Sequence, residues 1–313
     1  MPTPPALAPA DRAVRAIDCR GRALAVGPGH VHVVGVLNAT PDSFSDGGHY
    51  ADVGAAVARA AEMAEAGASV VDIGGESTRP GAPPVDADQE AARVVPVVRA
   101  VAREVPDVVI SVDTYKEPVA RAALAAGAHI VNDVTGLRDG VGTAVAAAEA
   151  GAPLVVMHSL GRTGGTAPAG AYGDVVADVV AGLRQSVERA HGAGVADVVV
   201  DPGFGFGKTP EQNLRLIARL DELVDQGWPV LVGVSRKSTV GVVLGEPGRP
   251  APVGERLYGS LGLAALAVVR GATFVRAHDV RETVETVRVV RAALAAGADE
   301  RPGALAVGGD GGP

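Results

Sequence analysis

The sequence predicts a single-domain α/β fold, the (β/α)8 TIM barrel, and three observations support this fold class. First, an Ala-rich amphipathic stretch, a glycine and a short β-branched run recur along the 313 residues. The glycine marks a helix end, because a residue without a Cβ adopts the left-handed conformation there without a clash. Second, the apolar runs are continuous, as in parallel strands covered on both faces. Third, eight such units favour a barrel over an open doubly wound sheet.

The recurring sequence pattern locates five strands, and three further apolar runs complete the barrel. The pattern reads AGASVVDIGG (66–75), AGAHIVNDV (126–134), AGAPLVVMH (150–158), QGWPVLVGVS (226–235) and RGATFVRAHD (270–279). The further runs are VHVVGVL (31–37), VVISV (108–112) and DVVV (197–200). Strands are therefore expected at 31–37, 69–73, 108–112, 129–132, 153–157, 197–200, 229–234 and 273–277. Helices are expected at 52–66, 87–104, 116–126, 140–150, 174–192, 210–226, 255–270 and 280–296.

The ends of the chain are expected to lie outside the barrel, which would span residues 31–297. Residues 1–30 form a predicted N-terminal extension, with a short hairpin between Arg15 and Val26. The tail, residues 298–313, is rich in Gly, Pro and Asp and is predicted to be disordered.

Composition narrows the class of protein. The chain is 47% hydrophobic, and its net charge of -8 comes without any run of Lys and Arg, which argues against nucleic-acid binding. No stretch of about 18 residues is apolar enough for a membrane span. The single cysteine, Cys19, excludes an internal disulfide, and the first residues lack the features of a secretory signal. We therefore expect a cytoplasmic enzyme that acts on small molecules.

Polar residues follow the predicted strands, where barrel active sites lie. They are Asn38, Asp72, Glu76, Asp113, Asn132, Asp133, His158, Asp201, Ser235, Arg236, Lys237, Ser238, Arg276 and His278. Any one of them could equally cap a helix or hold a loop. The whole ring indicates a bound ligand, because burying so many polar groups without one is costly.

The ring contains two kinds of chemistry. The carboxylates and amide of Asp113, Asn132 and Asp201 suit a planar heterocycle whose edge donates hydrogen bonds, such as an amino-pyrimidinone. The other kind is cationic or hydroxylic and suits a phosphate: Lys237, Arg276, His278, Ser235 and Ser238. Together they predict a phosphorylated heterocycle as the ligand.

The stretch DPGFGFGKT (201–209) ends like an ATP-binding P-loop. The glycine that this pattern requires is replaced by Pro202, which has no N–H to offer a phosphate. The P-loop interpretation is therefore disfavoured. Lys208 has two interpretations, an active-site cation, which is the preferred one, or a helix-start residue that stabilises the loop.

Ordered motifs make the chain resemble the dihydropteroate synthases, the folate-pathway enzymes that sulfonamides inhibit, over about residues 31–292. The motifs are GVLNATPDSFSDGG (35–48), DIGGESTRPGA (72–82), SVDT (111–114), VND (131–133), DPGFGFGK (201–208), GVSRKS (233–238), GS (259–260) and RAHDV (276–280). The resemblance implies condensation of 6-hydroxymethyl-7,8-dihydropterin pyrophosphate with 4-aminobenzoate by a dissociative, SN1-like step. It also implies Mg²⁺ as cofactor and a homodimer formed through helices late in the chain.

The resemblance further implies a role for each matching residue. The pterin-binding positions are Asp113, Asn132, Asp201 and Lys237, and the pyrophosphate positions are Asn38, Arg276 and His278. Asn38 also matches the Mg²⁺ ligand. The aminobenzoate positions are Thr78, Arg79, Pro80, Phe206, Lys237 and Ser238. The catalytic positions are Asp46, Arg79 and Lys237, the first two on loops 39–50 and 74–85, which are expected to close over the leaving group.

Alternatives stay open at this point. A paralogue could keep the pterin pocket without synthase activity, although it would not need the pyrophosphate and aminobenzoate positions. A pterin-binding methyltransferase domain and a non-enzymatic scaffold fit the motifs less well. The loop after the fifth strand, MHSLGRTGGTAPAGAYGD (157–174), departs from the family pattern. His158 at its start is as readily a packed histidine as a ligand.

Overall fold

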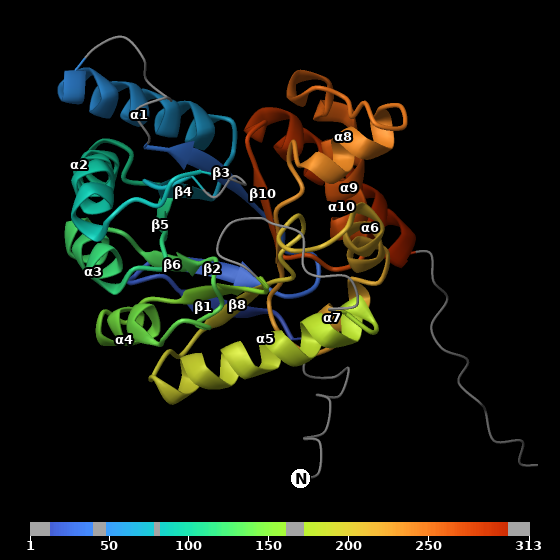
Figure 1. The fold of residues 1–313 in the computed structure, drawn as a ribbon, viewed down its shortest axis with the longest axis horizontal. Coiled ribbons are helices and arrows are strands. Elements are labelled where there is room, and N and C mark those ends of the chain that lie inside the picture. Colours follow the sequence, from blue (N-terminus) through green and yellow to red (C-terminus); the bar gives the residue numbers. More distant parts are fainter. Residues whose placement is uncertain (1–12, 40–47, 78–81, 161–171, 300–313) are drawn as a thin grey trace, which may run out of the picture.

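A computed structural model describes residues 13–39, 48–77, 82–160 and 172–299, and its centre is one parallel sheet (Figure 1). The strands are β3 (His32–Asn38), β4 (Val70–Gly74), β5 (Val109–Asp113), β6 (Ile130–Asp133), β7 (Leu154–Met157), β8 (Val198–Asp201), β9 (Leu231–Val232) and β10 (Phe274–Ala277). Their order is β8-β7-β6-β5-β4-β3-β10-β9. A parallel bridge between Val200 and Val230 joins the two outermost strands. The predicted (β/α)8 barrel is therefore confirmed.

Helices follow the strands and surround them (Figure 1). They are α1 (Gly48–Glu65), α2 (Ala87–Glu104), α3 (Glu117–Ala126), α4 (Gly142–Glu149), α5 (Val175–Gly192), α6 (Pro210–Ala218), α7 (Asp221–Val224), α8 (Ser238–Leu244), α9 (Leu257–Val269) and α10 (Val280–Asp299). A short 3-10 helix, Val253–Glu255, precedes α9. In the part of the chain that the structure describes, no helix is long and apolar enough to cross a membrane.

Two helical predictions were wrong. The helix expected at 210–226 is divided, because Arg219 leaves the helical conformation at φ -116° and ψ 30° and ends α6. Helix α8, for which no helix was expected, follows β9. Its sequence, STVGVVL, is rich in β-branched residues with low helix propensity, so tertiary contacts decide its conformation.

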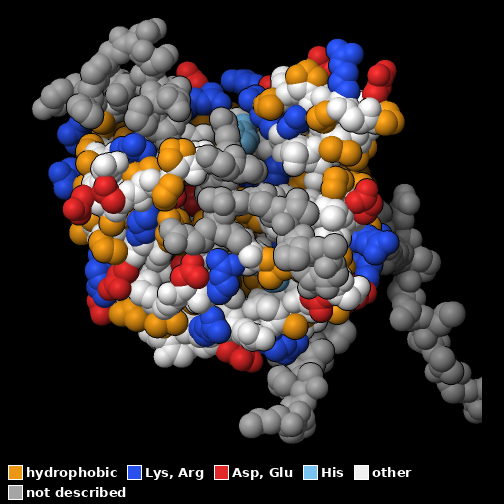
Figure 2. Space-filling view, viewed as in Figure 1, with side chains coloured by type: hydrophobic (Ala, Val, Ile, Leu, Met, Phe, Trp, Pro, Cys, Tyr) orange, Lys and Arg blue, Asp and Glu red, His pale blue; other side chains and the backbone are white. Residues whose placement is uncertain are grey.

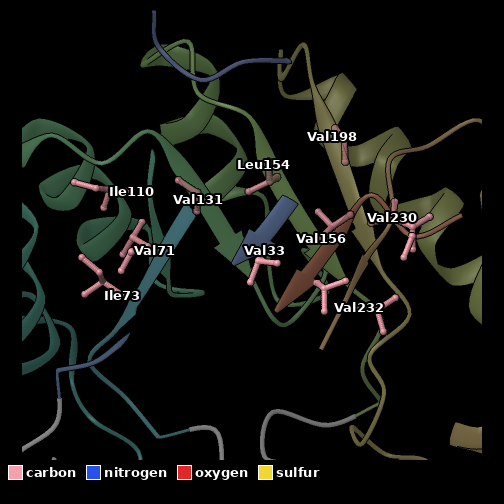
Figure 3. Packing of buried hydrophobic residues seen from close by; sticks show 14 of the residues in the cluster. Val33, Val71, Ile73, Ile110, Val131, Leu154, Val156, Val198, Val230 and Val232 are labelled. Atoms are coloured by element: carbon pink, nitrogen blue, oxygen red, sulfur yellow. The ribbon is translucent and has the colours of Figure 1, made fainter. Parts of the chain in front are cut away.

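The outward-facing side chains of the strands form the main core with the helices. Val33, Val71, Ile110 and Leu154 belong to this cluster, and Figure 3 shows them with their neighbours around the strands. The amphipathic helices supply the other side, such as Val94, Val98 and Val101 of α2. Burial of these surfaces is the main favourable term in folding, at about 25 cal/mol per Å² of apolar area.

The inward-facing side chains near the strand starts form a second apolar cluster, which we call the lower layer. It consists of Val34, Val70, Val109, Ile130, Val155, Val199, Leu231 and Phe274. The antiparallel hairpin of β1 (Arg15–Asp18) and β2 (Ala23–Val26) packs on it through Ile17, Cys19, Leu24 and Val26. The expected hairpin is thus present, and it closes the N-terminal end of the barrel.

Two residues further along each strand lies what we call the upper layer. It consists of Val36, Asp72, Ser111, Asn132, Met157, Asp201, Arg276 and, directly after β9, Gly233. Side chains alternate along a strand with a period of two, so these positions face the same interior as the lower layer. Five of these eight residues are polar or charged, so the interior changes from apolar to mainly polar within two residues. The division of the chain at residues 30 and 297 stays a prediction.

Candidate functional site

The loop after β8 requires its glycines. Gly203, Gly205 and Gly207 all have positive φ angles, of 69°, 83° and 67°, which favour glycine over other residues. A Cβ on Gly203 would lie 1.9 Å from the carbonyl oxygen of His158. The glycine-rich sequence therefore lets the loop pack tightly against the strand end of β7.

The N–H groups of this loop are used within the protein. The amide of Gly203 donates to Oδ1 of Asp201 at 2.7 Å, and the amide of Gly205 donates to Oδ1 of Asn213 at 2.8 Å. The amide of Phe206 donates to the carbonyl of Gly203 at 3.0 Å. A P-loop needs such groups free to bind phosphate, so the geometry also argues against a P-loop.

Lys208 stabilises this loop. Its ammonium group donates to the carbonyl oxygens of His158, Gly203 and Phe206 at 3.2, 3.0 and 3.0 Å, and the residue is buried. Burial lowers the pKa of Lys208 to about 7. Of its two interpretations, the contacts support the loop-stabilising one, because the hydrogen bonds of the ammonium group go to the backbone.

Lys237 and Phe206, two of the predicted aminobenzoate residues, lie together. The ammonium group of Lys237 donates to the carbonyl of Phe204 and lies 4.5 Å from the ring centroid of Phe206. Burial lowers the pKa of Lys237 to about 8, while the charge of Asp201 opposes that shift. Ser238, the first residue of α8, is exposed beside them. This side of the site thus combines a cation with an aromatic face.

A carboxylate and guanidinium cluster occupies the neighbouring strands. Arg276 donates from Nε to Oδ2 of Asp72 at 2.7 Å and from a terminal nitrogen to Oδ2 of Asp113 at 2.9 Å. Nδ2 of Asn132 donates to the same Oδ2 of Asp72 at 3.0 Å. The structure therefore brings together Asp113, Asn132 and Arg276, which the sequence had placed in the ring.

Two carboxyl groups of the site, those of Asp113 and Asp201, are hard to ionise. Burial raises the pKa of Asp113 to about 7; the nearby Arg276 opposes this shift and the charge of Asp72 adds to it. Burial also raises the pKa of Asp201, against the opposing charge of Lys237. Perturbed carboxyl groups at one mouth of a barrel are typical of a functional site.

His278 lies at the edge of the cluster. Its Nδ1 is 3.1 Å from Oγ of Ser235, which also accepts the backbone amide of His278 at 3.2 Å. Burial and the charge of Arg276 lower the pKa of His278 to about 4, so the ring is neutral at pH 7. Arg236 pairs instead with Asp279, with Nε 2.9 Å from Oδ2.

Other members of the predicted ring have structural roles. Glu76 pairs with Lys116, whose ammonium group also pairs with the buried Glu90 of α2. Oδ2 of Asp133 accepts a hydrogen bond from the hydroxyl of Thr143 in α4 at 2.6 Å. The ring is therefore smaller than the sequence indicated, because some strand-end residues hold loops and helix starts.

His158 directly follows β7 and packs within the protein. Its Nδ1 is buried without a hydrogen-bond partner, and its ring centroid is 6.0 Å from that of Tyr172. Burial and the charge of Lys208 lower the pKa of His158 to about 3. Both of its interpretations stay open, because residues 161–171 lie outside the described part of the chain.

Asn38 is exposed at the end of β3, next to Gly74 in the sheet register. Among the described residues no three His, Cys, Asp or Glu side chains gather in a way that could hold a metal. The side-chain amide of Asn38 offers an oxygen at this mouth, which suits a hard cation that keeps several waters and binds phosphate oxygens. The predicted residues Asp46, Thr78, Arg79 and Pro80 lie outside the described residues.

Comparison with known proteins identifies the family. A family model described as pterin binding enzyme matches residues 34–278, and the dihydropteroate synthase of Escherichia coli K12 is 46% identical over 274 residues, which cover 87% of this chain and 95% of that protein. The chain belongs to the dihydropteroate synthases. It is therefore an enzyme, a transferase of a pterin-methyl group.

Solved structures of other dihydropteroate synthases agree with this assignment. The Xanthomonas albilineans enzyme with 4-aminobenzoic acid has a TM-score of 0.81 and 42% identity, covering 90% of this chain and 99% of its own. The same enzyme in complex with 7,8-dihydropteroate has a TM-score of 0.77 and 40% identity, with the same coverage.

Sequence reasoning missed one central residue of this dihydropteroate synthase. Asp72 was placed in the polar ring but received no role, although two side chains donate to it. A signal was available, because Asp72 stands two residues after Val70 of the lower layer. The period of a strand therefore directs its side chain into the barrel.

Proposed function

We propose that this enzyme condenses 6-hydroxymethyl-7,8-dihydropterin pyrophosphate with 4-aminobenzoate, giving 7,8-dihydropteroate and pyrophosphate. The observation that carries this proposal is the pairing of acceptor groups with cations at one barrel mouth. Asp113 accepts a hydrogen bond from Arg276, and Asn132 and Arg276 both donate to Asp72. Lys237 lies near Asp201. Such a site can hold a donor-rich ring and an anionic leaving group side by side.

The pterin ring would bind against the upper layer. Asp113, Asn132 and Asp201 supply oxygen acceptors for ring N–H and amino groups, while Lys237 supplies a donor for the ring carbonyl. Met157, buried at the end of β7, offers an apolar surface beside them. The ring would displace the contact between Arg276 and Asp113, which frees the guanidinium for the pyrophosphate.

The reaction would begin with cleavage of the C–O bond to pyrophosphate. The bonding electron pair leaves with the oxygen, and Arg276 and the neutral His278 would donate hydrogen bonds to the charge that develops there. The cationic methylene that remains would be stabilised by ring delocalisation and by the carboxylates of Asp113 and Asp201. The amine of 4-aminobenzoate then forms the new C–N bond and releases its proton.

The aminobenzoate would bind on the opposite side of the methylene. Lys237 and the ring of Phe206 offer a cation and an aromatic surface, and Ser238 offers an exposed hydroxyl. We propose that Thr78, Arg79 and Pro80 complete this subsite and that Asp46 and Arg79 act in catalysis. No base is needed to activate the nucleophile, because an arylamine is neutral at pH 7.

We propose Mg²⁺ as the cofactor, held by the amide oxygen of Asn38 and by the substrate. When bound, it would neutralise charge on the pyrophosphate. The exposed oxygen at the end of β3 supports this role. Replacement of Asn38 by Ala should therefore raise the Mg²⁺ concentration for half-maximal activity while the melting temperature stays unchanged.

A homodimer is proposed from the apolar side chains that α8, α9 and α10 leave exposed. They include Val242, Val243, Tyr258, Val269 and Val289, and Tyr258 is 83% exposed. Hydrophobic side chains gather over α8 in the upper right of Figure 2. An exposed patch of this kind indicates a protein interface. The cytoplasm stays our predicted compartment for the enzyme.

An assay of pyrophosphate release tests the proposed reaction. Purified enzyme with the pterin pyrophosphate, Mg²⁺ and 4-aminobenzoate should release pyrophosphate and form 7,8-dihydropteroate, detected by mass spectrometry. Omission of 4-aminobenzoate or addition of EDTA should stop product formation. Tight binding of the pterin with no turnover under any of these conditions would contradict the proposal and favour a paralogue without synthase activity.

A further inference from the structure

Asp72 is the most enclosed acid of the site. It lies at the middle of β4, in register with Val36 on one side and Ser111 on the other, and its exposed fraction is 1%. Neither its sequence motif nor the ring of predicted site residues gave it a function. A buried carboxylate at this position needs a reason, because removing it from water is costly.

Both oxygens of Asp72 are in unusual situations. Oδ2 accepts hydrogen bonds from Nδ2 of Asn132 at 3.0 Å and from Nε of Arg276 at 2.7 Å. Oδ1 is buried and has no hydrogen-bond partner. A carboxylate that only stabilised the fold would have hydrogen-bond partners for both oxygens. We therefore infer that Asp72 serves to hold its two partners, Asn132 and Arg276.

The contact with Asn132 fixes one of two amide orientations. A carboxylate accepts hydrogen bonds and donates none, so the amide nitrogen of Asn132 must face Asp72. A half-turn of the amide would bring its oxygen against the carboxylate and replace a hydrogen bond with repulsion. The carbonyl oxygen of Asn132 is therefore held on the side away from Asp72, where it can accept from a ligand.

The contact with Arg276 anchors the guanidinium independently of Asp113. Arg276 uses Nε for Asp72 and a terminal nitrogen for Asp113, so release of Asp113 to a ligand leaves the Nε contact in place. The same acid thus holds the amide proposed for the ring and the cation proposed for the leaving group.

We propose that Asp72 is a positioning residue that determines specificity: it holds Asn132 with its carbonyl oxygen toward the ring and so selects a heterocycle whose edge donates hydrogen bonds. This inference rests on the proposed function, because it assigns a role within the pterin pocket. It predicts discrimination against a ring that carries an oxygen in place of the amino group, since two acceptors would then face each other.

The test compares two ring fragments without the pyrophosphate, 6-hydroxymethylpterin and 6-hydroxymethyllumazine, which has a 2-oxo group in place of the 2-amino group. Calorimetry gives the ratio of their dissociation constants. Wild-type protein should prefer the pterin by at least about tenfold, and Asp72→Asn should reduce that preference at least about fivefold, because the freed amide can turn. A preference retained within about twofold in Asp72→Asn would overturn the proposal.

The matched control is Asp133→Asn. Asp133 is equally buried and follows Asn132 in β6, but its carboxylate contacts Thr135 and Thr143. This variant should keep the wild-type preference for the pterin. An equal loss of preference in the control would mean that any buried acid near the site produces the effect, and the proposal would fall.

Exchange of the two side chains sharpens the test. In the double variant Asp72→Asn with Asn132→Asp, the amide donates from position 72 and an acceptor oxygen again faces the ring. The preference for the pterin should return to within about threefold of the wild type. A double variant no more selective than Asp72→Asn would contradict the orienting role.

A measurement on the wild-type protein does not depend on any of these variants folding. One Nδ2 proton of Asn132 should show slow exchange with solvent and a downfield NMR shift, as expected for a hydrogen bond to a carboxylate. Two freely exchanging protons would overturn the proposal. If wild-type protein shows the bonded proton but binds neither ring, the proposed function fails while the contact between Asp72 and Asn132 stands.

Discussion

The lower and upper layers of the barrel interior lie two residues apart on the same strands and have opposite chemistry. The lower layer runs from Val34 to Phe274 without a polar group and is covered by the hairpin. The upper layer contains Asp72, Asn132, Asp201 and Arg276. The comparison shows that one half of each strand maintains the fold while the other half keeps charged groups partly dehydrated.

Burial of the two layers has opposite effects on the free energy of folding. Burial of the lower layer stabilises the fold, because its side chains lose only apolar contact with water. Burial of the upper layer raises the pKa of Asp113 to about 7 and lowers that of Lys237 to about 8, which means that the charged forms are held at a cost. Ligand contacts can recover that cost, so substitutions in the two layers should affect different measurements.

The largest expected effect is on activity at the polar end. Replacement of Lys237 by Ala should lower kcat/KM at least about 1,000-fold, or about 4 kcal/mol of transition-state stabilisation, because we propose that this cation contacts both substrates. The neighbouring Arg236, which pairs with Asp279, supplies the control. Arg236→Ala should keep most of the activity, and equal losses in both variants would remove the distinction between the two cations.

The next effect is on stability at the apolar end. Leu24 of the hairpin is buried against the lower layer. Its replacement by Ala should lower the free energy of unfolding by about 2 to 5 kcal/mol. The folded variant should keep kcat/KM within about twofold of the wild type. Leu294 of α10, which is 45% exposed, is the control, and Leu294→Ala should leave the unfolding free energy nearly unchanged. A large activity loss in Leu24→Ala would show that the two layers are coupled.

A smaller effect should appear in the pH dependence. Burial raises the pKa of Asp113 to about 7, so its carboxyl is neutral below that pH and becomes a full acceptor above it. The KM for the pterin pyrophosphate should therefore fall as pH rises from 6 to 7, by about fivefold. In Asp113→Asn all other titrating groups of the enzyme and substrate remain, so this variant should lack only the change in KM that Asp113 causes. Parallel pH profiles for the two proteins would contradict the assignment.

The smallest effect is expected for an exposed ion pair far from both layers. Arg270 lies 3.4 Å from Asp221, with exposed fractions of 42% and 50% for the two side chains. Arg270→Ala should change the unfolding free energy by less than about 1 kcal/mol and leave activity unaffected, because water screens the pair. Thermal unfolding in low and high salt measures this contribution, and a large loss would indicate an additional contact of Arg270.

The fold could be predicted in detail because its signals are local and repeated. Each buried strand carries a continuous apolar run, and several of the preceding helices are followed by a glycine with positive φ, such as Gly67 and Gly127. Helix α8 escaped prediction because its residues favour strands and only its packing makes it helical. The division at Arg219 escaped for a related reason, since no Gly or Pro marks it.

Several residues of the site could be predicted from the sequence, but the contacts between them could not. The family motifs identified Asp113, Asn132 and Arg276, which the structure brings together. The contacts of Lys208 do not support its preferred active-site interpretation, and Asp72 had been left without a role. Both depend on partners from several strands and loops at once, which the sequence does not show.

The sequence by itself determined the barrel, the hairpin, the family and the residues at the mouth, because these follow from short-range periodicity and from motifs in a fixed order. Only the tertiary structure decided that Lys208 holds a loop, that Glu76 and Asp133 face structural partners, and that Asp72 joins Asn132 to Arg276. The physical reason is that a side chain's role depends on the partners that folding brings to it, and those partners lie up to 204 residues away along the chain.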